Sequence, residues 1–292
     1  MLMLSALISG IGLGSMYGLM ALGFHVTYAV SGTVNFAQGS SMMLGAVLTY
    51  TFVQTLAWPL VPAIALALLI CAAYGLLVEA LAVRPFVRRG SEAWLMATVA
   101  MGIVLDNLVM FAFGKEPRSL HSPLANTPLE IGGLGLGVYP LQLVIPLVGL
   151  CLAAGLHLLS RRTRWGTAML AVMQNREAAR LMGIPAQRVV AGAFALSAVL
   201  AGIAGALIAP LVNVHADMGT VFGLKAFAVA ILGGISSAWG VLLAGLLFGL
   251  AEALIAATLG SGYTQIISFS LVIVALALRP DGLFGHAQVR KV

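Results

Sequence analysis

Residues 226–278 read AFAVAILGGISSAWGVLLAGLLFGLAEALIAATLGSGYTQIISFSLVIVALAL and contain a single charged side chain, that of Glu252. Residues 1–83 likewise contain one charge, Glu79. A membrane-crossing helix needs about 20 consecutive apolar residues, so each stretch is long enough for several such helices joined by short neutral turns. A β-barrel would instead show short segments of alternating polarity. The sequence therefore predicts an all-α integral membrane protein, a polytopic helical bundle.

The overall composition indicates the same class. Hydrophobic residues make up 61% of the chain and charged residues 8%, against about 45–50% and about 25% in ordinary globular proteins. So few charges cannot cover the surface of a soluble globule, which excludes a cytosolic enzyme, a disordered chain and a disulfide scaffold. The net charge of +6 comes from arginines between the apolar runs, so we expect contact with membrane lipid and none with nucleic acid.

Nine transmembrane helices are the preferred interpretation, within a range of eight to ten, and they form a single domain over residues 1–292. Residues 25–35 can prolong the first run or form a re-entrant piece, and we expect the first run to be retained rather than cleaved as a signal peptide. The run 220–236 is short for a crossing and can be a half-helix. The runs cover about residues 2–24, 36–56, 60–83, 93–113, 140–160, 189–211, 220–236, 238–258 and 263–279.

Arginines gather in alternate gaps between these runs. Because cytoplasmic loops of membrane proteins are enriched in Lys and Arg, we expect the Arg-rich gaps and the C-terminus in the cytoplasm. The nearly neutral gaps, 114–139 and 212–225, are expected outside, the latter with Asp217 and Lys225; with nine helices the N-terminus is outside too. The cytoplasmic cations are Arg84, Arg88 and Arg89 in one gap, Arg161, Arg162, Arg164, Arg176, Arg180 and Arg188 in the next, and Arg279, Arg290 and Lys291 in the tail.

Glycine and small hydroxyl residues mark two further features. The gap 114–139 is rich in Pro and Gly and predicts an irregular extracytoplasmic loop. Residues 35–41 and 233–240 both place Gly and Ser immediately before an apolar run. Paired glycine-interrupted segments point to a translocation path near the middle of the membrane, but small residues are also ordinary helix-packing material. An internal repeat is therefore one of two open interpretations.

The gap 161–188 is long enough for an amphipathic cytoplasmic helix, which we expect over residues 167–184. Thr167 can cap its start, and Gly183 followed by Pro185 is a typical helix stop. The apolar side of such a helix must be covered by another surface. It can lie on the lipid surface with its arginines toward anionic headgroups, or in a groove of a cytoplasmic partner.

The sequence contains no pattern of catalytic chemistry. Its five histidines lack metal-ligand spacing, and neither a Gly-x-Ser-x-Gly segment nor a Gly-x-x-x-x-Gly-Lys-Ser/Thr phosphate loop occurs. Cys71 and Cys151 lie inside apolar runs and are expected to be packed thiols. We therefore expect no enzyme activity, no metal and no cofactor on this chain; if ATP is used, another chain supplies the ATPase.

Two amides, Asn35 and Gln38, stand at the start of the second run. A buried amide costs free energy unless it is hydrogen-bonded. These side chains therefore either hold two helices together or line a wet path, and the sequence leaves both interpretations open.

Carboxylates inside the runs are the other candidates. Asp106 is the one carboxylate of its run and a functional candidate by default, although it can also pair with Lys225 or reach water. Glu252 has no base in its own run and belongs either to a structural network or to the path. Glu79 lies close to Arg84 in the chain and is expected to be interfacial or ion-paired.

The segment Glu177-Ala178-Ala179-x-x-x-Gly183 resembles the Glu-Ala-Ala-x-x-x-Gly core of the coupling loop of ABC importer permeases, although the Ile-x-Leu-Pro that follows in that pattern is absent. Over its whole length the chain is similar to the LivH-type permeases of the branched-chain amino acid ABC importers. That family usually has His where Gln38 stands. The resemblance is carried by GSMYGL at 14–19, NFAQG at 35–39, RP at 84–85, residues 175–184, GLKAF at 223–227, residues 245–254 and RPDGLFG at 279–285.

The resemblance implies an ABC importer permease fold, alternating access and a place in the bacterial inner membrane. It implies four kinds of partner: a second permease, a homologous LivM-type chain; two cytoplasmic ATPases that bind ATP and Mg; a periplasmic solute-binding protein; and membrane lipid. We expect the translocation path to include Asn35, Phe36, Gln38, Asp106, Ser236, Ser237 and Glu252. We expect the ATPase-coupling residues to be Asn175, Glu177, Ala178, Ala179, Arg180, Leu181 and Gly183.

The solute is expected to be a branched-chain or other small amino acid, with urea, short amides and small carboxylic acids as the alternative, because similar permeases carry all of these. A secondary transporter or channel that works alone is the rival from another class. It would be expected to place coupling carboxylates or a His relay inside the membrane. Co-purification of stoichiometric ATPases would decide against it.

The Arg distribution predicts the topology in a form that labelling can check. A cysteine introduced at Ser91 or Thr163 should react with a membrane-impermeant thiol reagent only from the cytoplasmic side. A cysteine at Ser122 should react only from outside. Labelling of position 163 from the periplasm would overturn the assignment of both sides.

Overall fold

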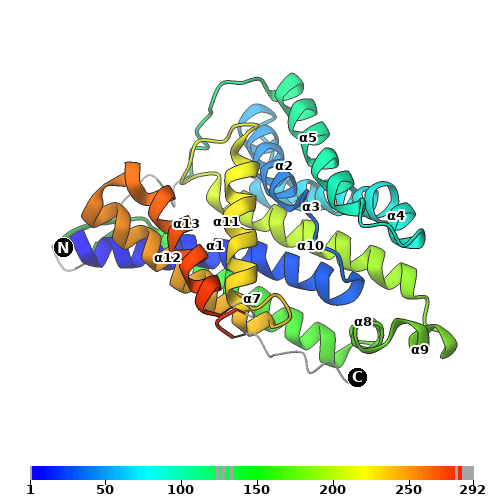
Figure 1. Cartoon of the computed structure of the whole chain (residues 1–292). Helices are drawn as coiled ribbons and strands as arrows, with labels where there is room; N and C mark the ends of the chain where they lie inside the picture. The colour runs from blue at the N-terminus through cyan, green and yellow to red at the C-terminus, as the bar shows by residue number, and fades with distance from the viewer. Residues whose placement is uncertain (1, 123–124, 126–128, 132–133, 280–281, 285–292) are drawn as a thin grey trace.

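The computed structural model describes residues 2–122, 125, 129–131, 134–279 and 282–284 (Figure 1). Helices make up almost all of its regular structure, which confirms the predicted all-α class. The helices are α1 (Leu2–Ser31), α2 (Gln38–Tyr50), the π-helical η1 (Thr51–Thr55), α3 (Leu60–Val78), the π-helical η2 (Glu79–Val83), α4 (Arg84–Arg88), α5 (Trp94–Phe113), α7 (Pro140–Arg162), α8 (Arg164–Gln174), α9 (Arg176–Leu181), α10 (Ala186–Ile208), α11 (Met218–Gly233), α12 (Ala238–Leu259) and α13 (Ser261–Leu278).

Within the described residues, seven helices are long and apolar enough to cross a membrane. Two further apolar segments are shorter: α11, with 16 residues, and α2 with its continuation η1. Each of the nine predicted runs therefore corresponds to a helical segment. The first run continues through residue 31, so most of residues 25–35 prolong α1. Residues 35–41 and 233–240 open α2 and α12 as expected, and the internal repeat stays a prediction.

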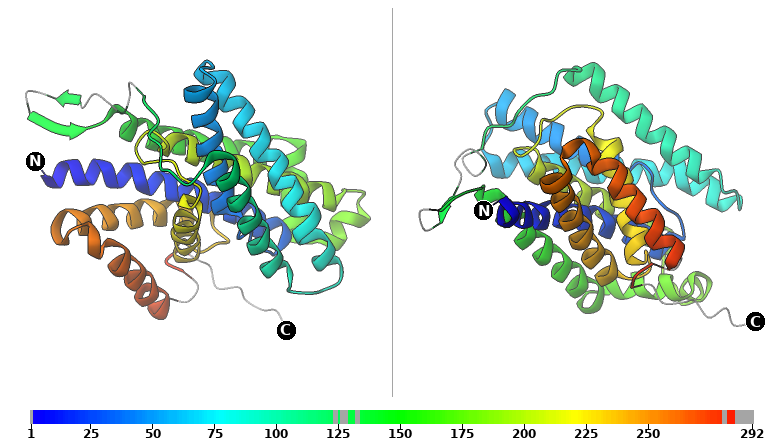
Figure 2. Two further views of the ribbon diagram at one scale, coloured as in Figure 1. Left: turned by 90° about the horizontal axis from the view of Figure 1, so that it is seen from above. Right: turned by 60° about the vertical axis from the view of Figure 1, so that its left-hand side comes forward.

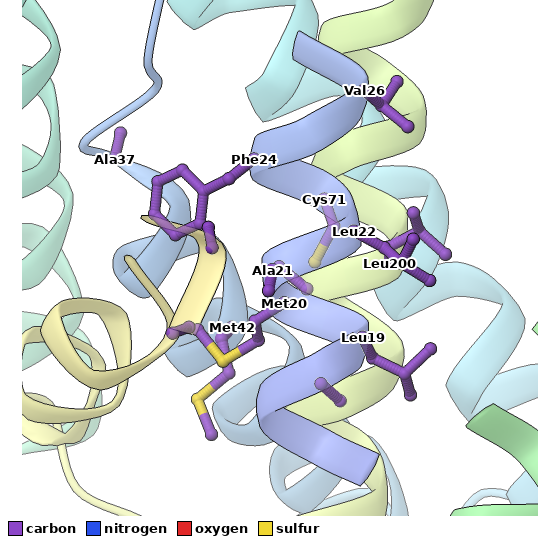
Figure 3. Packing of buried hydrophobic residues seen from close by; sticks show 14 of the residues in the cluster. Leu19, Met20, Ala21, Leu22, Phe24, Val26, Ala37, Met42, Cys71 and Leu200 are labelled. Atoms are coloured by element: carbon purple, nitrogen blue, oxygen red, sulfur yellow. The ribbon is translucent and has the colours of Figure 1, made fainter. Parts of the chain in front are cut away.

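Helix α1 lies at the centre of the bundle. It packs against α12, α10, α7 and α11, and its middle turns are buried all around. In Figure 3, Phe24 leaves one side of α1 toward Ala37, whereas Leu22 and Val26 leave it on the other side. Fully buried side chains of α1 include Met16, Tyr17, Leu19, Met20, Leu22 and Phe24.

Helix backbones come close together at glycine in several places, two of which involve α1 with α12 and α2 with α11. A Cβ atom on Gly14 of α1 would lie 2.7 Å from the carbonyl oxygen of Gly245 in α12, and one on Gly219 of α11 would lie 2.5 Å from that of Gly39 in α2. No side chain larger than hydrogen fits at such distances. Small residues allow this close approach, which provides much of the packing energy between helices in a membrane.

The two Arg-rich gaps lie at one end of the bundle and the N-terminus lies at the other. In Figures 1 and 2, α4, α8 and α9 lie at the end opposite the N-terminus and the β hairpin. This arrangement is what the predicted topology requires of gaps 84–92 and 161–188. Arg290 and Lys291 of the tail lie outside the described residues.

The gap 114–139 contains regular structure that the sequence did not predict. Strands β1 (Leu129–Ile131) and β2 (Leu134–Val138) pair antiparallel. Arg118 exchanges two backbone hydrogen bonds with Val214, of 3.0 and 2.8 Å, which tie this loop to the one before α11. Residues 123–124, 126–128 and 132–133 of the gap lie outside the described residues.

The close approach of α1 and α12 predicts a strong effect of Gly14→Leu. The added side chain would push the two backbones apart, and we expect a loss of about 3 kcal/mol of stability, as for overpacking of a tight core. Thermal unfolding of the purified protein in detergent measures it. The matched control is Gly155→Leu in α7, where an added Cβ meets nothing within 4 Å. Equal melting temperatures for the two variants would contradict the packing argument.

Candidate functional site

A cavity of about 240 Å³ lies where the start of α2 meets α5 and α11. Phe36 and Asp106, both predicted for the path, line it. Phe227 of α11 packs against Phe36 and Phe24, with ring centroids 5.1 and 5.6 Å apart. The remaining lining residues are Gly39, Ser40, Val99, Gly102, Ile103, Gly219, Thr220, Gly223 and Leu224. The cavity is therefore aromatic and apolar, with few polar groups.

Asp106 is the one charged residue of this cavity. Its Oδ1 atom is buried and has no hydrogen-bond partner among the described residues. The predicted alternative of pairing with Lys225 is wrong, because Lys225 bonds to Glu252. Asp106 is half-buried as a residue and lines the cavity, so its carboxylate group can meet a cationic or hydrogen-bond-donating group there.

The amides at positions 35 and 38 lie behind the cavity wall and are fully buried. The Oδ1 atom of Asn35 accepts a 3.1 Å hydrogen bond from the backbone N–H of Ala37, and its Nδ2 has no partner in the described chain. Gln38 donates from Nε2 to the carbonyl oxygen of Ser197 at 3.1 Å, and its Oε1 lies 2.8 Å from the Ser197 hydroxyl. That hydroxyl is also 2.9 Å from the carbonyl oxygen of Gly23.

The geometry of Gln38 therefore ties α1, α2 and α10 together. Of the two interpretations that the sequence left open, this contact favours the structural one. Its role in the path stays a prediction, as does that of Asn35.

Ser236 and Ser237 lie in the turn between α11 and α12, at the opposite end of α11 from Gly219. Along α11 this separation is roughly 20 Å at 1.5 Å per residue. Ser237 accepts a 3.1 Å hydrogen bond from the N–H of Gly240 and so caps α12. A 2.7 Å hydrogen bond between Nδ1 of His25 and the carbonyl oxygen of Ile235 fastens the turn to α1. The structure thus does not bring these serines to the cavity, and their place in the path stays a prediction.

Glu252 belongs to a buried cluster of three helices. The Nζ atom of Lys225 in α11 donates to Glu252 in α12 and to the hydroxyl of Tyr17 in α1, the latter at 3.4 Å. Lys225 and Glu252 are each 8% exposed. The expectation that Lys225 lies in the outer gap is wrong, since it lies within α11. A buried charge is tolerated when a partner neutralises it. The lone carboxylate in the apolar residues 226–278 could therefore have predicted a basic side chain close to it in space.

Glu79 is ion-paired with Arg84 at 2.6 Å, as predicted.

The predicted coupling segment is two helices rather than one. Asn175 has an extended backbone and interrupts the helix, and its side chain accepts hydrogen bonds from the N–H groups of Glu177 and Ala178, both of 3.0 Å. The start of the segment is capped by Thr163, whose hydroxyl accepts from Gly166, and not by Thr167. Sequence periodicity could not distinguish these caps, because several hydroxyl residues precede the apolar positions.

The outer surface of α9 is unusual for a short polar helix. Leu181 is 89% exposed and Met182 is 83% exposed. Glu177, Ala178 and Arg180 are also exposed, whereas Ala179 is buried. Gly183 ends the segment with φ of +81°, a conformation that favours glycine. Of the two predicted alanines, only Ala178 is therefore available to a partner.

Comparison with known proteins gives a consistent result. The family model described as "Branched-chain amino acid transport system / permease component" matches residues 6–276. The chain is 33% identical to the high-affinity branched-chain amino acid transport system permease protein LivH of Escherichia coli (strain K12), over 99% of this chain and 97% of that one. It is 32% identical to the corresponding BraD protein of Pseudomonas aeruginosa, over 99% and 98%.

The solved structure titled PsaBC from Streptococcus pneumoniae in complex with Fab shares the fold, with a TM-score of 0.53 and 12% identity over 95% of this chain and 91% of that one. The full-length match to the permeases, together with the polytopic helical bundle, decides the assignment. The chain belongs to the family of permease components of branched-chain amino acid transport systems.

Proposed function

We propose that this chain is one of two membrane-spanning permease subunits of an ATP-driven importer for branched-chain or other small amino acids. One observation carries the proposal: an apolar cavity at α2, α5 and α11 is lined by one carboxylate, that of Asp106, in a chain that also exposes α9 at its Arg-rich end. The cavity can accept a solute, and the exposed α9 can bind an ATPase subunit.

The cavity is consistent with half of a path. Its volume of about 240 Å³ is below the range of about 300–1,000 Å³ that is typical of ligand pockets. Two residues at its rim, Ile103 and Leu224, are 56% and 51% exposed. A second permease, a LivM-type chain, would cover this rim and complete the path. Alternation of the two subunits between arrangements open to either side would then move the solute.

The lining suggests the chemistry of the solute. Three phenylalanines and several aliphatic residues suit an apolar side chain, and the carboxylate of Asp106 suits an ammonium group. A small anion would be repelled by the same carboxylate. This favours amino acids over small carboxylic acids, and leaves urea and short amides as the solutes to compare.

The coupling surface suggests the partner. Leu181, the last residue of α9, and Met182, which follows it, are exposed apolar residues beside the charged Glu177 and Arg180. A short helix that presents such residues can dock in a groove of another protein. We assign that groove to two cytoplasmic ATPases, which bind ATP and Mg, while a periplasmic solute-binding protein delivers the solute at the opposite end. No group of His, Cys, Asp and Glu residues that could hold a metal occurs in the described residues.

The charge of Asp106 predicts a change in solute preference. Asp106→Asn should lower uptake of leucine about tenfold in proteoliposomes that contain all the subunits, because a charge-assisted hydrogen bond is worth about 1.5–3 kcal/mol. Uptake of a neutral amide should change little, because such a solute carries no ammonium group.

The control for that variant is Glu92→Gln, which removes an exposed carboxylate just before α5 that does not line the cavity. Its leucine uptake should equal that of the wild type. Normal leucine uptake by Asp106→Asn would remove this residue from the path.

The coupling proposal predicts that Ala178→Glu weakens docking of the ATPases. A charged side chain at a close contact costs on the order of 3 kcal/mol, which lowers affinity more than a hundredfold. The measurement is the amount of ATPase that co-purifies with the permease, together with solute-stimulated hydrolysis.

Ala93→Glu serves as the matched control, because Ala93 is an exposed alanine in the other Arg-rich gap. It should retain both properties. If α9 instead lay on lipid, Ala178→Glu would bind the ATPases as well as Ala93→Glu does, and the coupling assignment would fail.

A further inference from the structure

Five arginines from two separate parts of the chain meet in one cleft at the Arg-rich end of the bundle. Arg84 and Arg88 come from α4, Arg176 and Arg180 from α9, and Arg188 from the first turn of α10. We call this group the arginine cleft. Its main part has a volume of about 510 Å³, and a smaller adjoining pocket includes Arg176 and Glu79. It lies apart from the translocation path and from Leu181 and Met182, and it shares Arg180 with the proposed coupling residues.

The positive charge of the cleft is largely uncompensated. Glu79 is the one carboxylate that lines it, and both of its oxygens bond to Arg84, at 3.2 and 2.6 Å. Arg88 donates to the neutral Oε1 of Gln187 at 2.5 Å. Among the described residues, the other four guanidinium groups of the cleft make no ion pair. Five cations and one anion leave a net charge of +4 around a single opening.

Guanidinium groups in such an arrangement suit a phosphate. The planar fork of arginine binds phosphate oxygens through two parallel hydrogen bonds, and several arginines around one cleft can divide the oxygens between them. Without an anion the like charges repel one another. The cleft is therefore expected to be stabilised by an anionic ligand.

The position of the cleft identifies the source of that phosphate. Arg84 and Arg88 end the membrane span Leu60–Arg88, and Arg188 lies at the start of the span Ala186–Ile208, so these side chains lie at the level of lipid headgroups. Preceding Arg84 within two turns, Leu77 and Leu81 are 44% and 60% exposed. Acyl chains can therefore lie on this apolar surface while the phosphate enters the cleft.

We propose that the arginine cleft binds the headgroup of an anionic phospholipid of the cytoplasmic leaflet. Basic pockets between helices on the cytoplasmic side are known to suit such headgroups. The bound phosphate would bridge α4 to α9 and α10. Because it needs only this chain and lipid, the site does not depend on the identity of the transported solute.

Native mass spectrometry of the full-length chain tests the proposal. The chain is incubated in detergent with phosphatidylglycerol, cardiolipin or phosphatidylcholine, and the lipid retained by each molecule is counted. Wild-type protein should retain an anionic lipid and lose phosphatidylcholine. The double variant Arg88→Gln/Arg180→Gln should retain about tenfold less anionic lipid, because each arginine contributes to the attraction.

Two controls keep the result interpretable. Arg161→Gln/Arg162→Gln removes the same charge from exposed positions at the end of α7 and should retain lipid as the wild type does. Arg88→Lys/Arg180→Lys keeps the charge and should retain most of the lipid, which shows that the cleft still folds. Equal lipid retention by the two Gln pairs would overturn the proposal.

Two further outcomes would also overturn it. If inorganic phosphate alone displaces the lipid from wild-type protein and stabilises it as much as the lipid does, the ligand is free phosphate. If Arg88→Gln/Arg188→Gln, which leaves the coupling residue Arg180 in place, retains lipid normally but loses co-purified ATPases, the cleft binds an acidic surface of a protein.

Discussion

Helices inside a bilayer gain no hydrophobic free energy by leaving lipid for one another, so this fold depends on close backbone packing at glycine. Gly14 and Gly245 bring α1 against α12, and Gly39 and Gly219 bring α2 against α11. These contacts surround α1 with other helices and fix the position of α11 across the bundle. The cavity follows from them, because glycines that lie close to each other at α2 and α11 leave room beside Phe36 that larger residues would fill.

Polar groups inside the bundle complete this packing, since an unpaired one is costly in a medium of low dielectric constant. Gln38 and Ser197 join α2 to α10, and Lys225 and Glu252 join α11 to α12. Some buried polar atoms of the described residues still lack a partner, among them Oδ1 of Asp106 and Oε2 of Glu252. Glu252 is neutralised by Lys225, whereas Asp106 lines the cavity and makes no ion pair among the described residues.

The charged side chains at the Arg-rich end of the bundle have a different role. There the arginines are near water and headgroups, where an ion costs little to hold. Among the described residues, the one ion pair that these arginines make is that of Arg84 with Glu79. Instead they surround a cleft to which α9 contributes. The end that presents the proposed coupling surface is therefore also the end whose geometry is expected to respond to the charge of the membrane.

The sequence by itself determined the membrane class, the positions of the apolar segments and the two ends of the bundle, because these depend on local composition and on where arginines can reach water. It also singled out Phe36 and Asp106, which line one cavity and whose place in the path stays a prediction. Only the tertiary structure decided that Lys225 pairs with Glu252, that Ser237 caps a helix away from the cavity, and that Asn175 divides the coupling segment. Such choices depend on how each helix is rotated and on which neighbour it meets. The rotation of a helix and its neighbours result from packing between segments distant in sequence, so no local sequence pattern predicts them.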